Sequence, residues 1–354
     1  MNRRDMMRLA GAAASAPVLA RVAGSTQAFA KPDQVVCMTW GGQWGDAMRD
    51  NVDAAYTKAT GIKVLQDRGS SPVERITKLK VSLANQTVDL VQIHDGLVPL
   101  AIKQGVLEKI NKDSPRLNHV RNMVPSFWND YWVPMLFSVT GIIYNTKLVK
   151  TPPTSWADLW KPEYKGRIVL PEVSHSIGTY IIPIGALAAG KDPKDAEAGF
   201  EMLKKIADLK PIFAKDTDSI MNALRTEEAV IGILYKSQTY TVKGWNAPVE
   251  WAYPKEGGIP YSSGTSIAKG SKNLEAAEDY LNVTMDPQVQ TFVATVYNYA
   301  GTNKDMAAKL SPELQERVKF PPEQMAKLVN LDHDFMSERR AEWTQRWNRV
   351  VAGG

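Results

Sequence analysis

The stretch Trp132-Val-Pro-Met-Leu-Phe-Ser-Val-Thr-Gly-Ile-Ile-Tyr144 suggests a chain that crosses between two structural units. Its two apolar runs, residues 132–139 and 142–144, favour strands, and Ser138-Val-Thr-Gly141 joins them as a crossover. A second stretch of this kind, Tyr261–Ala268, predicts the return crossover. We therefore expect two lobes joined by two crossover hinges, with a ligand cleft between them.

On both sides of this stretch, short apolar runs alternate with amphipathic helical patterns. Val35–Trp40 and Val88–Ile93 are examples of strand-like runs, and each is followed by a segment with helical periodicity. This alternation predicts the α/β fold class, with each lobe a sheet flanked by helices. The first lobe is expected to comprise residues 31–139 together with 262–354, and the second lobe residues 140–261.

Residues 1–30 have the pattern of a cleaved export signal. Arg3 and Arg4 precede the apolar stretch Leu9–Ala20, and Ala28-Phe-Ala30 has the small-x-small pattern of a signal-peptidase site. A helix over that apolar stretch would span about 18 Å, too short for a hydrocarbon core of about 30 Å. The paired arginines favour a twin-arginine (Tat) signal, with an ordinary Sec signal as the alternative. Cleavage is expected near Ala30, and the mature chain is expected outside the cytoplasm.

The charge of the remaining chain argues against nucleic acid or an anionic membrane as a partner. The whole sequence has a net charge of +5 from 43 basic and 38 acidic residues. The first thirty residues hold four of the arginines and one of the aspartates, so 39 basic and 37 acidic residues remain. No run of five or more Lys and Arg residues occurs, and binding to nucleic acid is not expected.

The residues that could hold a metal or perform catalysis lack the spacing that these functions need. Cys37 is the single cysteine, which excludes an internal disulfide. The four histidines, at positions 94, 119, 175 and 333, are scattered, so no metal ion and no cofactor are expected. Ser266-Ile-Ala-Lys269 matches S-x-x-K, but the Ser-Asp-Asn and Lys-Thr-Gly motifs of penicillin-interacting enzymes are absent from the sequence. We therefore do not expect an enzyme.

Two stretches resemble the spermidine/putrescine-binding proteins of bacterial ABC importers, within the extracellular solute-binding proteins. They are Thr154-Ser-Trp-Ala-Asp-Leu-Trp-Lys-Pro-Glu-Tyr-Lys-Gly166 and Pro254-Lys-Glu-Gly-Gly-Ile259; Asn273–Glu278 and Ser311-Pro-Glu313 fit the same pattern. The resemblance implies the two-lobed type 2 periplasmic-binding-protein fold. It also implies a periplasmic monomer that closes over a small-molecule ligand and delivers it to the membrane permease of an ABC transporter.

The sequence departs from this family at the positions that would hold a polyamine. After Pro254–Ile259 the family carries a tryptophan and, two residues later, an aspartate; this chain has Tyr261 and Ser263. The first-strand loop reads Trp40-Gly-Gly42 where a family glutamate would help. Because a buried ammonium without a counter-charge is strongly unfavourable, the expected ligand is a small organic acid, a phosphonate or an amino-acid-like zwitterion. A polyamine is the alternative.

Candidate ligand-binding residues follow strand ends, crossovers and helix starts. Backbone amides of the Gly-rich turn favour an anion. Asp95 either holds an amine or caps the following helix, and His94 is either a ligand donor or structural. Hydroxyl groups and tyrosines would supply uncharged hydrogen bonds and an aromatic wall. The full set is Trp40, Gly41, Gly42, Trp44, His94, Asp95, Ser138, Thr140, Ser174, His175, Ser176, Tyr235, Tyr261 and Ser263.

Overall fold

The computed structural model describes residues 31–352 of the chain. The predicted signal peptide and its cleavage site lie outside these residues. None of the helices within them is both long enough and apolar enough to cross a bilayer.

The strands of the described residues form one hydrogen-bonded sheet with the order β2-β1-β3-β9-β4-β7-β5-β6. Strands β8 and β10 pair with β4 outside this path. Pairing is parallel within β2-β1-β3 and within β7-β5-β6, whereas β9 and β4 run antiparallel to their neighbours. The bounds are β1 (Gln34–Thr39), β2 (Lys63–Arg68), β3 (Leu90–His94), β4 (Val133–Asn145), β5 (Ile168–Pro171), β6 (Ile212–Ala214), β7 (Ile231–Tyr235), β8 (Val249–Ala252), β9 (Ile259–Ile267) and β10 (Ala300–Gly301).

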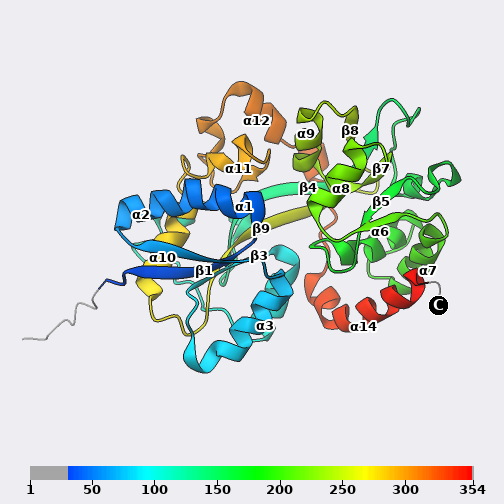
Figure 1. Cartoon of the computed structure of the whole chain (residues 1–354). Coiled ribbons are helices and arrows are strands. Elements are labelled where there is room, and N and C mark those ends of the chain that lie inside the picture. Colours follow the sequence, from blue (N-terminus) through cyan, green and yellow to red (C-terminus); the bar gives the residue numbers. More distant parts are fainter. Residues whose placement is uncertain (1–30, 353–354) are drawn as a thin grey trace, which may run out of the picture. The chain divides into compact units, whose positions relative to one another are not determined.

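Helices pack around both groups of parallel strands, as expected for an α/β chain (Figure 1). Around β1–β3 lie α1 (Gly42–Met48), α2 (Ala54–Thr60), α3 (Pro72–Ser82), α4 (Val98–Lys103) and α10 (Leu274–Thr284). Around β5–β7 lie α6 (Ile181–Ala188), α7 (Ala196–Ala207), α8 (Thr217–Arg225) and α9 (Lys236–Gly244). The remaining α-helices are α5 (Asn118–Arg121), α11 (Thr291–Thr295), α12 (Pro312–Val318), α13 (Pro322–Met325) and α14 (His333–Val351).

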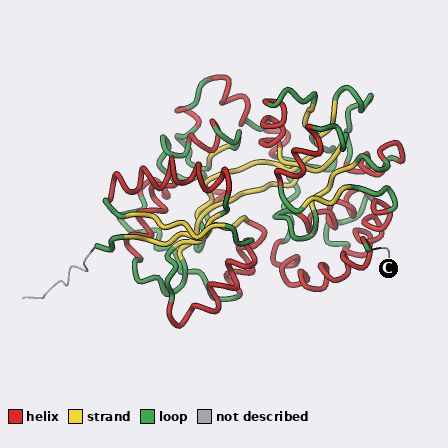
Figure 2. The backbone as a smooth tube through the Cα atoms, viewed as in Figure 1, coloured by secondary structure: helices red, strands yellow, loops and turns green. Residues whose placement is uncertain are grey.

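Strand β4 is continuous where the sequence predicts two strands separated at residues 138–141. Figure 2 shows β4 and β9 as the long strands that run between the two groups. The first half of β4 pairs with β9, and its second half pairs with β7. Thr140 is opposite both Ile259 of β9 and Tyr235 of β7. The prediction of a break was wrong because both edges of β4 remain paired: β9 is followed by β8 along one edge, and β10 by β7 along the other.

Two glycines allow β4 to pack closely against its neighbours, β9 and the ring of Trp251. A Cβ atom added to Gly264 of β9 would lie 2.1 Å from the carbonyl oxygen of Val133 on β4. A Cβ atom added to Gly141 of β4 would lie 2.6 Å from the ring of Trp251. Both approaches are shorter than van der Waals contact, so a larger residue would force the strands or the tryptophan to move.

The C-terminal helix α14 contacts elements of both predicted lobes. Trp343 and Trp347 are buried, and Trp347 packs edge-on against Phe213 with 4.9 Å between ring centroids. Trp343 lies against Phe200 of α7, with 6.2 Å between centroids. The N-terminal half of α14 lies against α4 and the short helix η3 (Asp95–Leu97). Helix α14 is therefore anchored on the β5–β7 side and reaches the carboxyl end of β3.

We predict that Trp343→Ala lowers the free energy of unfolding by about 3–5 kcal/mol, because it leaves a cavity beside Phe200. Trp343 is 2% exposed, whereas Trp245 is 44% exposed and supplies a matched control. Trp245→Ala should cost less than about 1 kcal/mol. Urea unfolding of both variants measures the difference, and equal losses would contradict the anchoring of α14.

Candidate functional site

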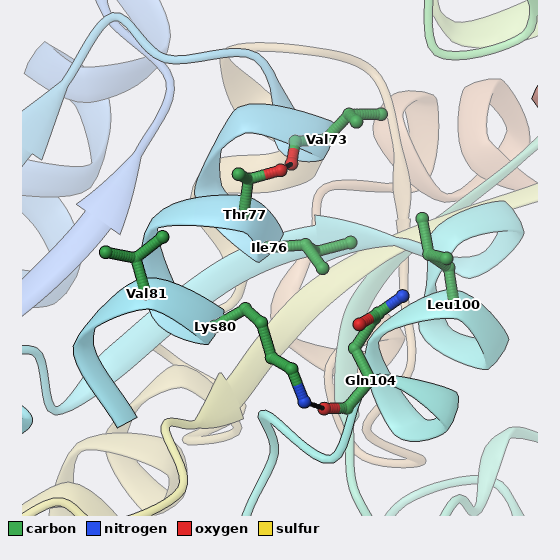
Figure 3. Close-up of a pocket in the computed structure, with 7 residues that line it drawn as sticks. All are labelled: Val73, Ile76, Thr77, Lys80, Val81, Leu100 and Gln104. Atoms are coloured by element: carbon green, nitrogen blue, oxygen red, sulfur yellow. Dashed lines mark hydrogen bonds between the residues drawn. The ribbon is translucent and has the colours of Figure 1, made fainter. Parts of the chain in front are cut away.

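Two hollows on the described part of the chain differ in their lining, and the smaller of the two is the more polar. The larger takes in about 470 Å³ of space, part of it open to solvent, between α3 and α4. It is lined by Val73, Ile76, Thr77, Lys80, Val81, Leu100 and Gln104 (Figure 3). Most of these groups are aliphatic, and the Lys80 ammonium already donates to the Gln104 carbonyl oxygen at 2.9 Å. This groove offers few groups to orient a polar solute.

The smaller hollow, the polar cavity, takes in about 230 Å³ of space, part of it open to solvent, where β3, the short helix η7 (Gly178–Tyr180) and α14 meet. Its enclosed part has room for about one water molecule, so a larger ligand group would enter only if the surrounding elements move apart. Its lining residues are His94, Gly96, Ser176, Thr179, Tyr180, His333, Met336, Ser337 and Arg340. They come from both predicted lobes and from α14. Ligands of open α/β sheets collect at the carboxyl ends of strands, and β3 ends in this cavity. We therefore take the polar cavity as the centre of the candidate site.

His94 is the last residue of β3 and is 1% exposed. Neither ring nitrogen has a hydrogen-bond partner, and Nδ1 lies 3.7 Å from Oδ1 of Asp95, beyond hydrogen-bond length. Burial lowers the pKa of this imidazole, so its neutral form is favoured. A Cβ atom added to Gly96 would lie 3.2 Å from Cε1 of His94 and 3.5 Å from Nδ1 of His333. The two imidazoles thus flank Gly96 and offer unused polar atoms to the cavity.

Asp95 cross-links the elements around the cavity. Its Oδ2 accepts a hydrogen bond from the Ser262 backbone N–H on β9 at 2.7 Å. Its Oδ1 accepts from the Gly96 backbone N–H at 2.8 Å and from the Tyr180 hydroxyl at 3.5 Å. Its carboxylate is therefore bonded to β9, to its own turn and to η7, rather than to an amide of α4.

Tyr235 and Tyr261, which the sequence predicts as an aromatic wall of the site, pack against each other. Their ring centroids are 4.2 Å apart, and both side chains are buried. His94 stacks on Tyr261 with 6.2 Å between centroids, and Tyr299 lies 6.4 Å from each tyrosine. Burial raises the pKa of both phenols well above the usual value of about 10, so the wall is uncharged.

Trp40 and Trp44 flank the Gly-rich turn after β1 and have different surroundings. The Trp44 indole N–H donates to Oε1 of Gln92 at 2.9 Å, and its ring packs against Tyr297 at 5.3 Å. Trp40 is half-buried and meets Trp44 edge-on. Gly41 is the N-cap of α1, and Gly42 has a φ of 58°, in the left-handed region that favours glycine.

Arg75, which is not among the site residues predicted from the sequence, lies behind Trp40. It is 0% exposed, and its guanidinium carbon is 4.3 Å from the Trp40 ring centroid. It donates to the backbone carbonyls of Ser70 and Gln92, but its Nη2 has no partner. Within residues 31–352 it forms no ion pair, and burial lowers its pKa to about 10. Arg75 lies on the buried face of α3, beside Ile76. A cation at such a position is the feature of the sequence that could have identified it.

The serine and threonine hydroxyl groups predicted for the site differ in their surroundings. Ser176 lines the polar cavity, whereas Ser174 is exposed and donates to Glu172. Ser138 accepts from the Ser237 N–H at 3.3 Å, and Ser263 donates to the Ile93 carbonyl at 3.4 Å. Thr140 is 0% exposed, and its hydroxyl has no partner in the described chain.

His175 is 4% exposed, and both of its ring nitrogens are used within the protein. The Ile177 backbone N–H donates to Nδ1 at 3.1 Å, so Nδ1 is an acceptor. Nε2 therefore carries the proton and donates to the Thr217 hydroxyl at 3.1 Å. Burial lowers the pKa of His175 to about 4.

The contribution of α14 to the cavity was also not predicted. His333, Ser337 and Arg340 follow at spacings of four and three, which puts them on one face of the helix. Arg340 lies in register with the apolar stripe of Met336, Trp343 and Trp347. A cation within an apolar stripe is unusual, and this feature of the sequence could have identified Arg340. Among residues 31–352, no cluster of three or more His, Cys, Asp or Glu side chains could hold a metal ion.

Comparison with protein families gives one match that covers most of the chain. The model of the family "Bacterial extracellular solute-binding protein" matches residues 51–322. The spermidine/putrescine-binding periplasmic protein of Escherichia coli K12 is 30% identical over 280 residues, covering 77% of this chain and 79% of that protein.

Solved structures with the same fold include periplasmic binding proteins of different names. The Atu4243 GABA receptor has a TM-score of 0.79 and 24% identity, and the match covers 91% of this chain and 98% of that one. The spermidine/putrescine ABC transporter substrate-binding protein of Streptococcus pneumoniae has a TM-score of 0.72 and 20% identity, with 90% and 99% covered. The predicted two-lobed α/β fold of periplasmic binding proteins is thereby confirmed.

We predict that His175 makes stability fall as the pH is lowered from about 6.5 to about 4. Its folded pKa of about 4 lies below the unfolded value of about 6.5, so in this window the unfolded state binds a proton that the folded state does not. The effect approaches about 3 kcal/mol and is absent above this window. Urea unfolding across this range should show a smaller fall for His175→Gln than for the wild type, and the buried His94, whose pKa is also lowered, contributes to the fall that remains. Parallel curves for the wild type and the variant would contradict this account.

Proposed function

Because the chain belongs to the family of bacterial extracellular solute-binding proteins, we propose that its ligand is a small organic solute with an acid group. The class comprises organic acids, phosphonates and amino-acid-like zwitterions. As a family member, the chain is the periplasmic solute-binding component of an ABC transporter and works with a membrane permease. The proposed ligand site is the polar cavity together with the tyrosine wall and the turn at Trp40.

The charges around this site are the observation that supports a ligand with an acid group. Arg75 is fully buried and Arg340 is half-buried, and desolvation lowers the pKa of both guanidinium groups. Neither forms an ion pair within residues 31–352. The neighbouring carboxylate, Asp95, already accepts three hydrogen bonds from protein groups. A ligand anion would offset the cost of the buried cations, whereas an ammonium would add to it.

The residue types predicted from the sequence fit the same class of ligand. Ser263 is opposite His94 in the pairing of β9 with β3, so the position of the family aspartate carries no charge here. Ser176 and His94 offer uncharged hydrogen-bonding groups in the cavity, and Tyr235 with Tyr261 offers an apolar wall. These groups suit a carboxylate or phosphonate on a short carbon skeleton.

A polyamine is the alternative, and the relatives support it. The Escherichia coli protein that is 30% identical is named for spermidine and putrescine. For this chain, a polyamine would have to find its carboxylates elsewhere than at position 263. The fold does not select between the two classes, since proteins named for GABA and for polyamines share it.

Binding is proposed to close the two lobes about β4 and β9. The moving bodies would be those predicted from the sequence, residues 31–139 with 262–354 and residues 140–261, except that α14 would move with the second body. Its packing on α7 through Trp343 supports this exception. The permease would then recognise the closed form.

A thermal-shift screen of residues 31–354 tests the ligand class. The panel holds organic acids, phosphonates, amino acids, putrescine and spermidine at matched ionic strength. A ligand at about 100 times its dissociation constant stabilises the folded chain by about 2.7 kcal/mol, which shifts Tm measurably. We expect hits among acids or zwitterions; hits with polyamines alone would establish the alternative.

We further predict that Ser263→Asp weakens binding of the acid found in that screen by more than about 1 kcal/mol, through like-charge repulsion. Ser311→Asp is the matched control, because it adds the same charge at the exposed N-cap of α12. Calorimetric titration of both variants, after circular dichroism confirms their folding, gives the affinities. Equal affinities in the two variants would mean that position 263 lies away from the ligand.

A further inference from the structure

We propose that the N-terminal half of α14 provides the subsite for the acid group of the ligand, with Arg340 as its cation. Ser337 and His333 on the same helix, and His94 across the cavity, supply hydrogen bonds to the same group. This inference rests on the proposed function, because it places the acid group of that ligand at named residues. None of the three α14 residues belongs to the set predicted from the sequence.

The unused polar atoms in the polar cavity are the first support. His94 is 1% exposed and lacks a partner at both ring nitrogens. The buried hydroxyl oxygen of Ser337 also lacks a partner. Buried polar atoms in native proteins are generally hydrogen-bonded, so these atoms indicate a missing polar partner. Both residues line the same cavity as Arg340, so one bound group could serve all of them.

The charge of the cavity identifies the chemistry of that partner. Arg340 lines the cavity and forms no ion pair within residues 31–352. The guanidinium of an arginine matches a carboxylate or a phosphonate with two parallel hydrogen bonds. An ammonium would meet Arg340 and would find Asp95 already engaged by Ser262 and Gly96. The cavity therefore suits an anionic group and disfavours a cationic one.

The helix that carries the subsite is held in place from the opposite end. Trp343 and Trp347 are buried against Phe200 and Phe213, one and two turns beyond Arg340. The ring of His333 lies 6.0 Å from that of Tyr180, whose hydroxyl donates to Asp95. The subsite is thus built on packed elements rather than on a free loop, which limits the entropy lost on binding.

The four histidines of the sequence provide a direct readout of the subsite. His94 and His333 line the cavity, whereas His175 is bonded to Ile177 and Thr217, and His119 lies near Asp286. Protein labelled with ¹⁵N-histidine would be titrated with sodium acetate or methylphosphonate, with sodium chloride as the ionic-strength reference. We expect saturable shifts of the His94 and His333 ring signals with at least one of the two anions. The His119 and His175 signals should remain in place.

Variants of neighbouring arginines show whether Arg340 is the cation. Arg340→Gln should weaken binding of the same anion at least tenfold, and Ser337→Ala should weaken it severalfold. Arg339→Gln is the matched control on the same helix, because Arg339 lies over Phe335 and beside Glu338, outside the cavity lining. It should leave the affinity unchanged. Equal effects of the two arginine variants, or unmoved His94 and His333 signals, would overturn the subsite.

The two proposals fail in different ways. If the ligand is a polyamine, the thermal-shift screen gives no acid hits and the anions leave the histidine signals unmoved. If acids bind elsewhere in the protein, they stabilise the folded chain while the His94 and His333 signals and the Arg340→Gln affinity stay unchanged. Only the second result would overturn the subsite while leaving the proposed function intact.

Discussion

The antiparallel pairing of β4 with β9 is the interaction on which the rest of the structure depends. These strands join the two groups of parallel strands, and Thr140 of β4 is opposite a residue of β9 on one edge and a residue of β7 on the other. The same pairing positions the site, because Ser262 of β9 donates to Asp95 and Ser263 is opposite His94. In the lobe closure that we propose, these two continuous strands would bend while their backbone groups keep their hydrogen-bond partners.

The second constraint on the structure comes from two arginines near the site that lack a counter-charge. Arg75 and Arg340 enter the neighbourhood of the site from different helices, α3 and α14, and neither has a carboxylate partner in the described chain. Leaving buried cations unpaired reduces the stability of the unliganded protein. A solute-binding protein can recover that free energy when its ligand supplies the counter-charge, which couples affinity to the charge of the ligand.

The fold could be predicted from local patterns, and much of the site could not. Apolar periodicity located β1, β3 and β9 to within one or two residues, because short-range alternation reflects burial. The break predicted in β4 was wrong, since the pairing of both β4 edges depends on strands distant in sequence. Tyr235 and Tyr261 were predicted together and do pack together. Arg340 was missed because only tertiary packing brings the C-terminal helix to the end of β3.

Native mass spectrometry of the protein isolated from periplasm tests the central claim most directly, because a captured solute can remain bound. We predict an added mass that corresponds to a small solute with a carboxylate or phosphonate group. The same preparation of Arg340→Gln should lack that mass, whereas Arg339→Gln should retain it. An added mass equal to putrescine or spermidine in the wild-type protein would contradict the account.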